Sequence, residues 1–274
     1  MIQIKFWGVR GSTPTPQLEN LRYGGNTSCV ELQLPDGQSL IFDAGSGLRN
    51  LGTALVKQAG GASLDLGIFL THFHWDHIQG IPFFAPIYGP ANRVVFHSHN
   101  ENGSVEEILQ GQMARPYFPV DLASVAAKRE IVELNCGPVT FAGAKVWGFP
   151  LNHPQGAVGY RVEYGTTAVV YATDLEHGHP KLDSVLRDHA ANADILIYDA
   201  QYTPEEYETH RHWGHSTWVE AIRTARDARV KQVVLFHHDP SHDDDFLDAI
   251  GEAAVAEFAE VSPAKEGSVI EICP

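Results

Sequence analysis

Short apolar runs recur along the whole chain, and most of them end at glycine, asparagine or aspartate. The runs are rich in valine, isoleucine, phenylalanine and tyrosine, which are side chains that β-strands favour. This pattern predicts strands over residues 2–8, 28–34, 39–45, 65–71, 93–98, 143–151, 158–164, 167–173, 193–199, 232–237 and 267–272.

Helical periodicity, in which apolar side chains recur every three to four positions, appears in four other segments. In the last of them, Phe246, Leu247, Ile250, Ala254 and Phe258 follow that spacing. The pattern predicts helices over residues 47–59, 104–113, 217–229 and 244–260. Strand clusters come early in the chain and strands alternate with helices later. This order favours two β-sheets with helices on their outer faces.

The chain is predicted to form one domain over residues 1–274, because no linker rich in proline, glycine or serine divides it and no repeat is visible. Residues 100–138 have the weakest pattern. They are interpreted either as an excursion beside a functional site or as an ordinary surface loop with a short helix.

Composition and charge limit the substrates and the cellular compartment that we expect for this chain. With 34 acidic and 19 basic residues the formal charge is −15. A long nucleic acid is therefore a disfavoured substrate, because its backbone binds clustered lysine and arginine. No run approaches the roughly 18 to 20 apolar residues of a membrane span, and the N-terminus is too mixed for a signal peptide. The cytoplasm is the expected compartment. The three cysteines show no paired spacing, which argues against a disulfide framework.

Four potential metal ligands lie within six residues directly after an apolar strand. The segment 71–77 reads THFHWDH. His72 and His74 are two positions apart, so both imidazoles can point to one side. Asp76 and His77 follow on a turn and aim at a neighbouring point. Imidazole with carboxylate suits zinc, with manganese or iron as alternatives.

This cluster does not complete two coordination spheres, so further ligands are expected elsewhere. Three other strand-like runs end in a candidate ligand: His153, Asp174 and His237. His238 competes with His237, because neighbouring residues of a strand face opposite ways. We favour His237, since its spacing from the preceding apolar run matches that of His72.

The HxHxDH pattern followed by distant His, Asp and His resembles the metallo-β-lactamase superfamily, over nearly the whole chain. Residues 42–47 (FDAGSG) resemble the Asp-x-Gly turn before the family's first helix. The resemblance implies an α/β fold, the αββα sandwich of two mixed β-sheets flanked by helices. It implies two divalent metal ions, with zinc expected. One metal would be held by His72, His74 and His153. The second would be held by Asp76, His77 and His237, with Asp174 bridging the two.

Two further motifs resemble one branch of that superfamily, the tRNA 3′-processing endonucleases (ribonuclease Z) and their phosphodiesterase relatives. They are residues 7–14 (WGVRGSTP) and 214–217 (GHST). The resemblance implies that His215 acts on the scissile phosphate and is steadied by an acid. Asp199 matches that acidic position, where the family usually has glutamate. Thr217 and Glu220 can form a capping box, which would place His215 just before an anion-favouring helix N-terminus.

The expected function is a phosphodiesterase that uses a metal-bridged hydroxide, with His215 assisting the leaving oxygen and Asp76 orienting the hydroxide or accepting its proton. No basic, Gly/Pro-rich arm is visible, and the chain is acidic. Both features favour a small or cyclic nucleotide-type phosphodiester. Asp43 is expected either to support a ligand histidine or its loop, or to cap the turn. The candidate substrate contacts are Arg10, Arg22, Tyr23, Asn26 and Arg115.

Several alternatives stay open from the sequence. The same hydroxide could attack a carbonyl, so a β-lactam, lactone or thioester hydrolase is one alternative. A ribonuclease Z-like endoribonuclease is a second, and a non-catalytic metal-binding sensor is a third. A redox di-iron centre is weaker, because that pattern has glutamate where this chain has His74. A homodimer is compatible with the resemblance, since dimers are common in this branch.

Overall fold

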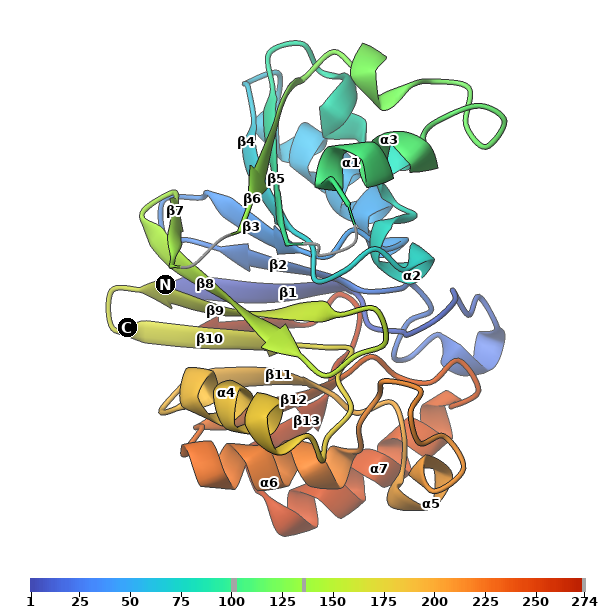
Figure 1. The fold of residues 1–274 in the computed structure, drawn as a ribbon, viewed down its shortest axis with the longest axis vertical. Coiled ribbons are helices and arrows are strands. Elements are labelled where there is room, and N and C mark those ends of the chain that lie inside the picture. The colour runs from blue at the N-terminus through green and yellow to red at the C-terminus, as the bar shows by residue number, and fades with distance from the viewer. Residues whose placement is uncertain (100–102, 135–136, 273–274) are drawn as a thin grey trace.

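The computed structural model describes residues 1–99, 103–134 and 137–272. Over these residues the strands form two seven-stranded sheets, in the orders β14-β1-β2-β3-β4-β5-β6 and β13-β12-β11-β10-β9-β8-β7. The chain runs through the first sheet, then the second, and returns with β14 to the edge of the first (Figure 1).

The first sheet combines antiparallel strands at one side with parallel strands at the other. β14, β1, β2 and β3 pair antiparallel, and β3, β4, β5 and β6 pair parallel. Its strands are β1 (Ile2–Gly8), β2 (Cys29–Gln33), β3 (Ser39–Phe42), β4 (Asp65–Phe69), β5 (Arg93–Ser98), β6 (Lys128–Glu133) and β14 (Val269–Ile272).

The second sheet is mixed in the same way. β7 to β10 pair antiparallel, and β10 to β13 pair parallel. Its strands are β7 (Val139–Phe141), β8 (Ala144–Leu151), β9 (Ala157–Tyr164), β10 (Thr167–Ala172), β11 (Ile195–Asp199), β12 (Gln232–Phe236) and β13 (Val261–Pro263).

Helices cover the outer faces of both sheets (Figure 1). This confirms the prediction of two mixed sheets flanked by helices. The helices are α1 (Gly47–Ala59), α2 (Trp75–Ile78), α3 (Val105–Gln112), α4 (Pro180–Ala190), α5 (Pro204–Tyr207), α6 (Trp218–Ala228) and α7 (Asp244–Glu257). No helix in the described part of the chain is long and apolar enough to cross a membrane.

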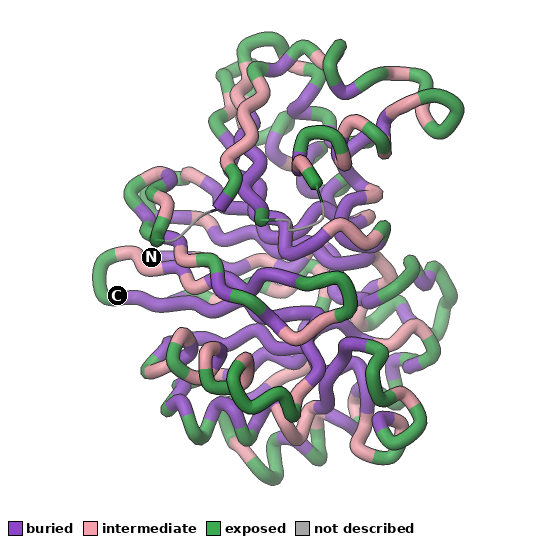
Figure 2. The backbone as a smooth tube through the Cα atoms, viewed as in Figure 1, coloured by how far each residue is buried: buried purple, intermediate pink, exposed green. Residues whose placement is uncertain are grey.

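Three apolar clusters hold these layers together, and Figure 2 shows the buried strands running through the centre of the molecule. The middle cluster lies between the two sheets. It joins Phe6, Phe42 and Phe69 of the first sheet to Tyr171 and Phe236 of the second. The outer clusters pack α1 and α3 on the first sheet, and α4, α6 and α7 on the second. Rigid packing around the strands fixes where their ends lie.

The predicted elements recur, with ends shifted by a few residues, but six were missed: β6, β7, β13, α4 and the short helices α2 and α5. β6 is an edge strand with half-buried and exposed side chains, so it lacks strict alternation. β13 contains Pro263, which weakens a strand signal. α4 is largely polar outside its few buried positions. Within the weakly patterned segment 100–138, the described residues contain α3 and β6, so part of it belongs to the sheet rather than to a loop.

Candidate metal centre

The seven predicted ligands converge at one edge of the two sheets. They follow β4, β8, β10 and β12, so side chains distant in sequence meet where these strands end. All seven fall into groups whose ligand atoms lie within 4.8 Å of one another. The groups are His72, His74 and His153; His72, His77 and Asp174; and Asp76, His77 and His237.

One half of the cluster has the dimensions of a tetrahedral metal site. His77 Nε2 lies 3.3 Å from His237 Nε2 and 3.2 Å from Asp76 Oδ2. His237 Nε2 lies 3.4 Å from Asp76 Oδ2, and Asp174 Oδ2 lies 3.2 and 3.3 Å from the two histidine nitrogens. Four ligands each about 2.1 Å from a zinc ion have edges of about 3.4 Å. The four donor atoms therefore match such a cage.

The other half shares one carboxylate with the first. His74 Nδ1 lies 3.3 Å from His153 Nε2, again the length of a tetrahedral edge. His72 Nε2 lies 3.7 Å from Asp174 Oδ1, whereas Asp174 Oδ2 faces the first cage. His72 Nε2 is also buried without a hydrogen-bond partner. A buried lone pair without a donor is costly unless a cation takes it, so this half also fits a metal. The His/Asp cluster is compatible with a dinuclear site.

Four imidazoles are oriented by a hydrogen bond on the nitrogen that faces away from the cluster. His77 Nδ1 donates to Asp43 Oδ2 at 2.8 Å, and His72 Nδ1 donates to Thr71 Oγ1 at 3.0 Å. The other two bonds join His153 Nδ1 to the Gly214 carbonyl and His237 Nδ1 to Gln201 Oε1, each at 2.9 Å. Each bond fixes the tautomer that leaves the Nε2 lone pair directed at the cluster.

Asp43 is completely buried and holds several groups of the site together. Besides His77, it accepts from the Thr71 amide at 2.8 Å, from the Thr71 hydroxyl, and from the Tyr171 hydroxyl at 2.9 Å. It thus links β3 to the loop after β4 and to β10. This geometry supports the interpretation of Asp43 as the partner of a ligand histidine.

Two glycines permit the backbone to approach the cluster closely. A Cβ added at Gly11 would lie 2.4 Å from His237 Cε1, and one at Gly214 would lie 2.4 Å from His153 Nδ1. The amide of Ser12 donates to Asp76 Oδ2 at 2.8 Å. The segments WGVRGSTP and GHST, recognised in the sequence as motifs, therefore form walls of the centre.

Burial and charge set the protonation of the ligands without metal. Burial lowers the pKa of His153 to about 4, and burial with the nearby charge of His77 lowers the pKa of His72. Both are therefore neutral at pH 7, the form that binds metal. Burial alone would lower the pKa of His237, but Asp174 and Asp76 raise it to about 9. The carboxylates thus concentrate negative charge at a point where a cation would replace the protons.

His215 and Asp199 form a dyad at the rim of the cluster. His215 Nδ1 donates to Asp199 Oδ2 at 2.9 Å, and the imidazole stacks on His237 with centroids 4.9 Å apart. Asp199 also accepts from the amides of Ser216 and Asp174, each at 3.0 Å, so its carboxylate is rigidly held. The predicted pairing of His215 with Asp199 is therefore present in the geometry.

The predicted helix cap after His215 is present in part. Thr217 caps α6, and its side chain accepts from the Glu220 amide at 3.3 Å. The Glu220 carboxylate pairs with Arg223 at 2.9 Å instead of reaching back to complete the box. His215 still lies just before the N-terminus of α6, as expected.

Four of the five candidate substrate contacts have polar partners within the chain, and their contact with a substrate stays a prediction. Arg10 is fully buried and donates to the carbonyls of Gly24, Asp239 and His242. Arg22 pairs with three aspartates at the start of α7, Tyr23 donates to Asp248, and Asn26 donates to Glu266. A sequence pattern does not reveal such local acidic partners. Arg115 is exposed on the turn after α3, and its role stays a prediction.

His238 points away from the centre, as predicted from strand alternation. Its Nε2 donates to the Ala264 carbonyl at 2.9 Å. Sequence reasoning missed Gln201, which accepts from the candidate ligand His237, and Tyr171, which donates to Asp43. Neither lies in a motif, although Gln201 follows Asp199 closely at the end of β11.

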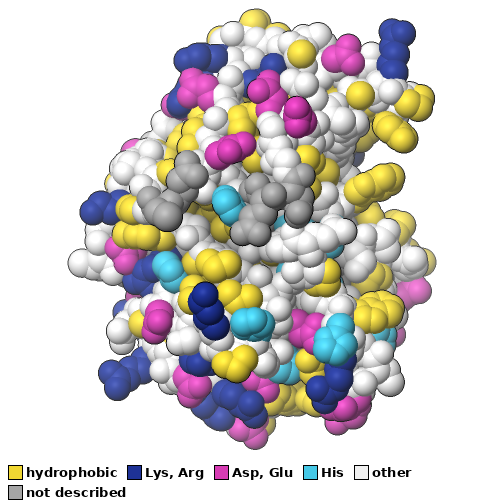
Figure 3. All heavy atoms as spheres, viewed as in Figure 1, with side chains coloured by type: hydrophobic (Ala, Val, Ile, Leu, Met, Phe, Trp, Pro, Cys, Tyr) yellow, Lys and Arg dark blue, Asp and Glu magenta, His cyan; other side chains and the backbone are white. Residues whose placement is uncertain are grey.

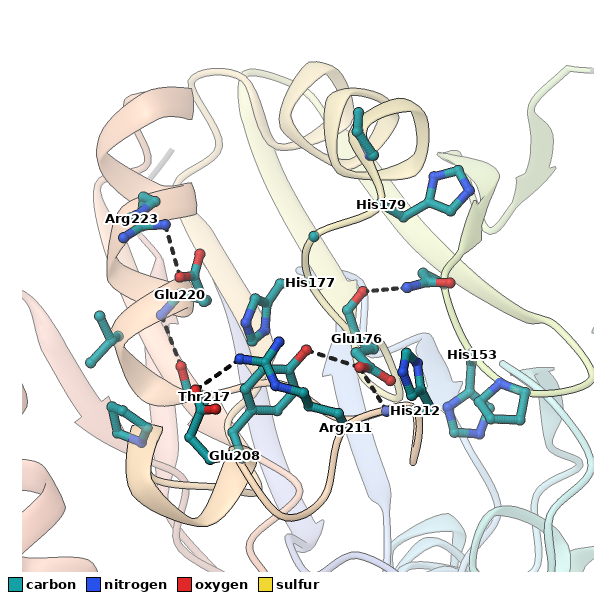
Figure 4. A pocket seen from close by; sticks show the side chains of 17 residues that line it. His153, Glu176, His177, His179, Glu208, Arg211, His212, Thr217, Glu220 and Arg223 are labelled. Atoms are coloured by element: carbon teal, nitrogen blue, oxygen red, sulfur yellow. Dashed lines mark hydrogen bonds and ion pairs between the residues drawn. The ribbon is translucent and has the colours of Figure 1, made fainter.

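A pocket of about 870 Å³ borders the centre on the side of His153 (Figure 4). Glu176 lies at its wall and accepts from the Tyr207 hydroxyl at 2.9 Å and from the amides of His212 and Gly214 at 2.8 and 3.1 Å. Sequence reasoning missed Glu176 as well. Its bonds fix the loop that carries the carbonyl of Gly214, the acceptor of His153.

Comparison with known proteins identifies the family. A model described as the beta-lactamase superfamily domain matches residues 39–238, which is most of the chain. The chain belongs to this superfamily. The ribonuclease Z of Streptococcus suis is 26% identical over 320 residues, covering 99% of this chain and 100% of the relative. As a superfamily member with such relatives, the chain is a metal-dependent hydrolase.

Solved structures agree on the fold. The metallo-β-lactamase fold protein YhfI from Bacillus subtilis superposes with a TM-score of 0.72 at 22% identity, covering 99% of both chains. A diphosphatase from the PhnP family gives a TM-score of 0.72 at 21% identity, covering 100% of this chain and 98% of its own. The superfamily's αββα sandwich, predicted from the HxHxDH pattern, is confirmed.

Proposed function

We propose that this superfamily member hydrolyses a phosphodiester of the nucleotide type, with two divalent cations, zinc expected, in the centre. His72, His74 and His153 would hold one cation, Asp76, His77 and His237 the other, and Asp174 both. When bound, the cations supply Lewis acidity, which makes water a nucleophile near neutral pH and neutralises charge on phosphoryl oxygens.

The observation that carries the phosphodiester assignment is the dyad of His215 and Asp199 beside the cluster. Asp199 accepts the Nδ1 proton at 2.9 Å and so fixes the orientation of the ring. The Nε2 atom is then the one free to exchange a proton with substrate. An alkoxide that leaves phosphorus needs a proton, and a positioned imidazole can deliver it.

Asp76 has two roles in this proposal, as a metal ligand and as the carboxylate that orients the attacking water. Its Oδ2 is one vertex of the cage and also accepts from the Ser12 amide, so the loop after β1 fixes its direction. A carboxylate held in this way can orient the attacking water and accept its proton.

Two classes of substrate, an RNA and a small nucleotide, are consistent with this chemistry. The relatives named ribonuclease Z do not support a small substrate and favour the 3′ end of an RNA. The charge of −15 and the internal pairing of Arg10 and Arg22 favour a small or cyclic nucleotide. We keep the small phosphodiester as the first candidate and the RNA end as the second.

A leaving-group comparison tests the proposed acid. Metal-loaded wild type and His215→Ala are assayed on bis-p-nitrophenyl phosphate, whose phenolate leaves without protonation, and on a dinucleotide, whose alkoxide does not. We expect the variant to lose about 10²- to 10⁴-fold on the dinucleotide and far less on the phenyl ester. Equal losses on both would remove His215 as the proton donor. Faster hydrolysis of nitrocefin or a lactone than of either phosphate would favour a carbonyl substrate instead.

A further inference from the structure

Two tryptophans lie next to site residues in the sequence and are exposed to solvent. Trp75 lies between His74 and Asp76 and is 80% exposed, and Trp213 precedes Gly214 and is 60% exposed. His74 is half-buried and Asp76 is buried on either side of Trp75, and Gly214 after Trp213 is buried. Burial of a large aromatic side chain contributes strongly to the stability of a folded protein. Exposed rings beside a hydrolytic centre therefore indicate a surface that binds a planar group.

Trp213 is joined to the candidate acid by a series of ring contacts. Its ring meets His210 edge-on with centroids 4.8 Å apart, and His210 stacks on Tyr202 at 4.7 Å. Tyr202 in turn meets His215 at 6.0 Å. An aromatic wall therefore runs from the dyad outwards and ends at the exposed indole.

On the other side, the aromatic surface extends beyond Trp75. Phe83, which follows α2, is 58% exposed and meets the half-buried Phe118 at 5.6 Å, and Tyr117 is 78% exposed. Figure 3 shows hydrophobic side chains gathered along the edge of the molecule where Figure 1 places α2 and the turn after α3. These rings come from the segment that follows the metal motif and from the turn after α3.

Two arginines of the N-terminal part of the chain do not offer a free charge to a substrate. Arg10 is buried against carbonyl groups, and Arg22 is neutralised by aspartates of α7. Stacking of bases on aromatic rings does not need positive charge and contributes on the order of 1 to 3 kcal/mol per base. A substrate that carries heterocyclic bases therefore gains binding free energy by stacking on exposed aromatic rings, without a cationic contact.

We propose that Trp75 and Trp213 stack on the heterocyclic bases that flank the phosphodiester held at the centre. The proposal rests on the proposed function and specifies its substrate class, a phosphodiester carrying at least one planar base. Because every base presents a flat face, the two rings select bases over plain alkyl or sugar groups without selecting a base sequence.

Binding of two product analogues separates stacking from metal contact. Metal-loaded wild type, Trp75→Ala, Trp213→Ala, and Trp75→Phe are titrated with adenosine monophosphate and with inorganic phosphate. Phe246→Ala, an exposed ring on α7, serves as the matched control. Because the probe carries one base, we expect at least one alanine variant to bind the nucleotide about tenfold more weakly or worse, with phosphate binding unchanged in both. Trp75→Phe keeps a ring and should stay within about threefold of wild type.

The outcomes distinguish this proposal from the function on which it rests. Unchanged nucleotide binding in both alanine variants would overturn stacking while leaving the hydrolase intact. Equal loss of nucleotide and phosphate binding in Trp75→Ala would also overturn it, because the residue would then act through the metal ligands. Failure of metal-loaded wild type to bind either ligand would instead count against the proposed phosphodiesterase.

Discussion

Replacing Gly11 with alanine tests whether the loop after β1 is part of the metal centre. The new Cβ would lie 2.4 Å from His237 Cε1, 2.5 Å from its Nδ1 and 2.9 Å from Gln201 Oε1, whereas ordinary contacts begin at 3.4 Å. His237 must therefore retreat by about 1 Å. The retreat stretches its 2.9 Å bond to Gln201 and moves Nε2 away from Asp76 and Asp174.

The expected magnitudes follow from that displacement. Loss of the groups that orient a ligand lowers metal affinity by about 10- to 100-fold, and a misplacement of about 1 Å at a catalytic centre costs about 10²-fold in rate. Overpacking should lower the free energy of unfolding by about 1 to 3 kcal/mol. We expect Gly11→Ala to retain the metal at His72, His74 and His153 and to lose the one at His237.

The assay is metal content after dialysis against a competing chelator, with circular dichroism to show that the fold is kept. Gly111→Ala is the matched control, because a Cβ at that helical position meets nothing within 4 Å. If Gly11→Ala holds two metals with wild-type affinity, the close approach of this loop to His237 does not affect metal binding. The loop after β1 is then not part of the metal centre.

Three further predictions follow from buried groups. Asp43→Asn no longer fixes the Nδ1 proton of His77, so metal affinity should fall by about 10- to 100-fold in a chelator competition; unchanged affinity would contradict this. Asp199→Asn should reproduce most of the rate loss of His215→Ala on a dinucleotide, whereas a wild-type rate would separate the two residues. Burial lowers the pKa of His97 to about 4, so the unfolded chain binds its proton first and stability falls as pH drops from about 6.5 to 4. In metal-free protein His97→Leu should remove up to about 3 kcal/mol of that acid-induced loss of stability. The free energy of unfolding is measured with urea at each pH for wild type and variant. If the two proteins lose the same free energy of unfolding between pH 6.5 and 4, the prediction is wrong.

The clustering of the seven candidate ligands could be predicted from the sequence because each segment that carries them follows an apolar strand. Because these strands end at one edge of the sheets, His153, Asp174 and His237 lie close to the segment 71–77. Strand alternation also separated His237 from His238. These inferences need only local pattern and the rigidity of a packed sheet.

Long-range polar partners could not be predicted in the same way. Arg10 looked free to meet a phosphate, yet it is buried against carbonyls of the loop that follows β12. Gln201 and Glu176 carry no motif, and their roles depend on which backbone amides and imidazoles the fold brings near them. The edge strand β6 was missed because its side chains are only half buried. The single-domain organisation stays a prediction.

The most direct test of a two-metal phosphodiesterase is a titration of zinc into metal-free protein while dinucleotide hydrolysis is followed. We predict that activity rises with added metal and stops rising at two ions per chain, because His77, His237, Asp76 and Asp174 enclose one site and His72, His74 and His153 the other. Full activity at one ion per chain, or no hydrolysis of the phosphodiester at two, would contradict it.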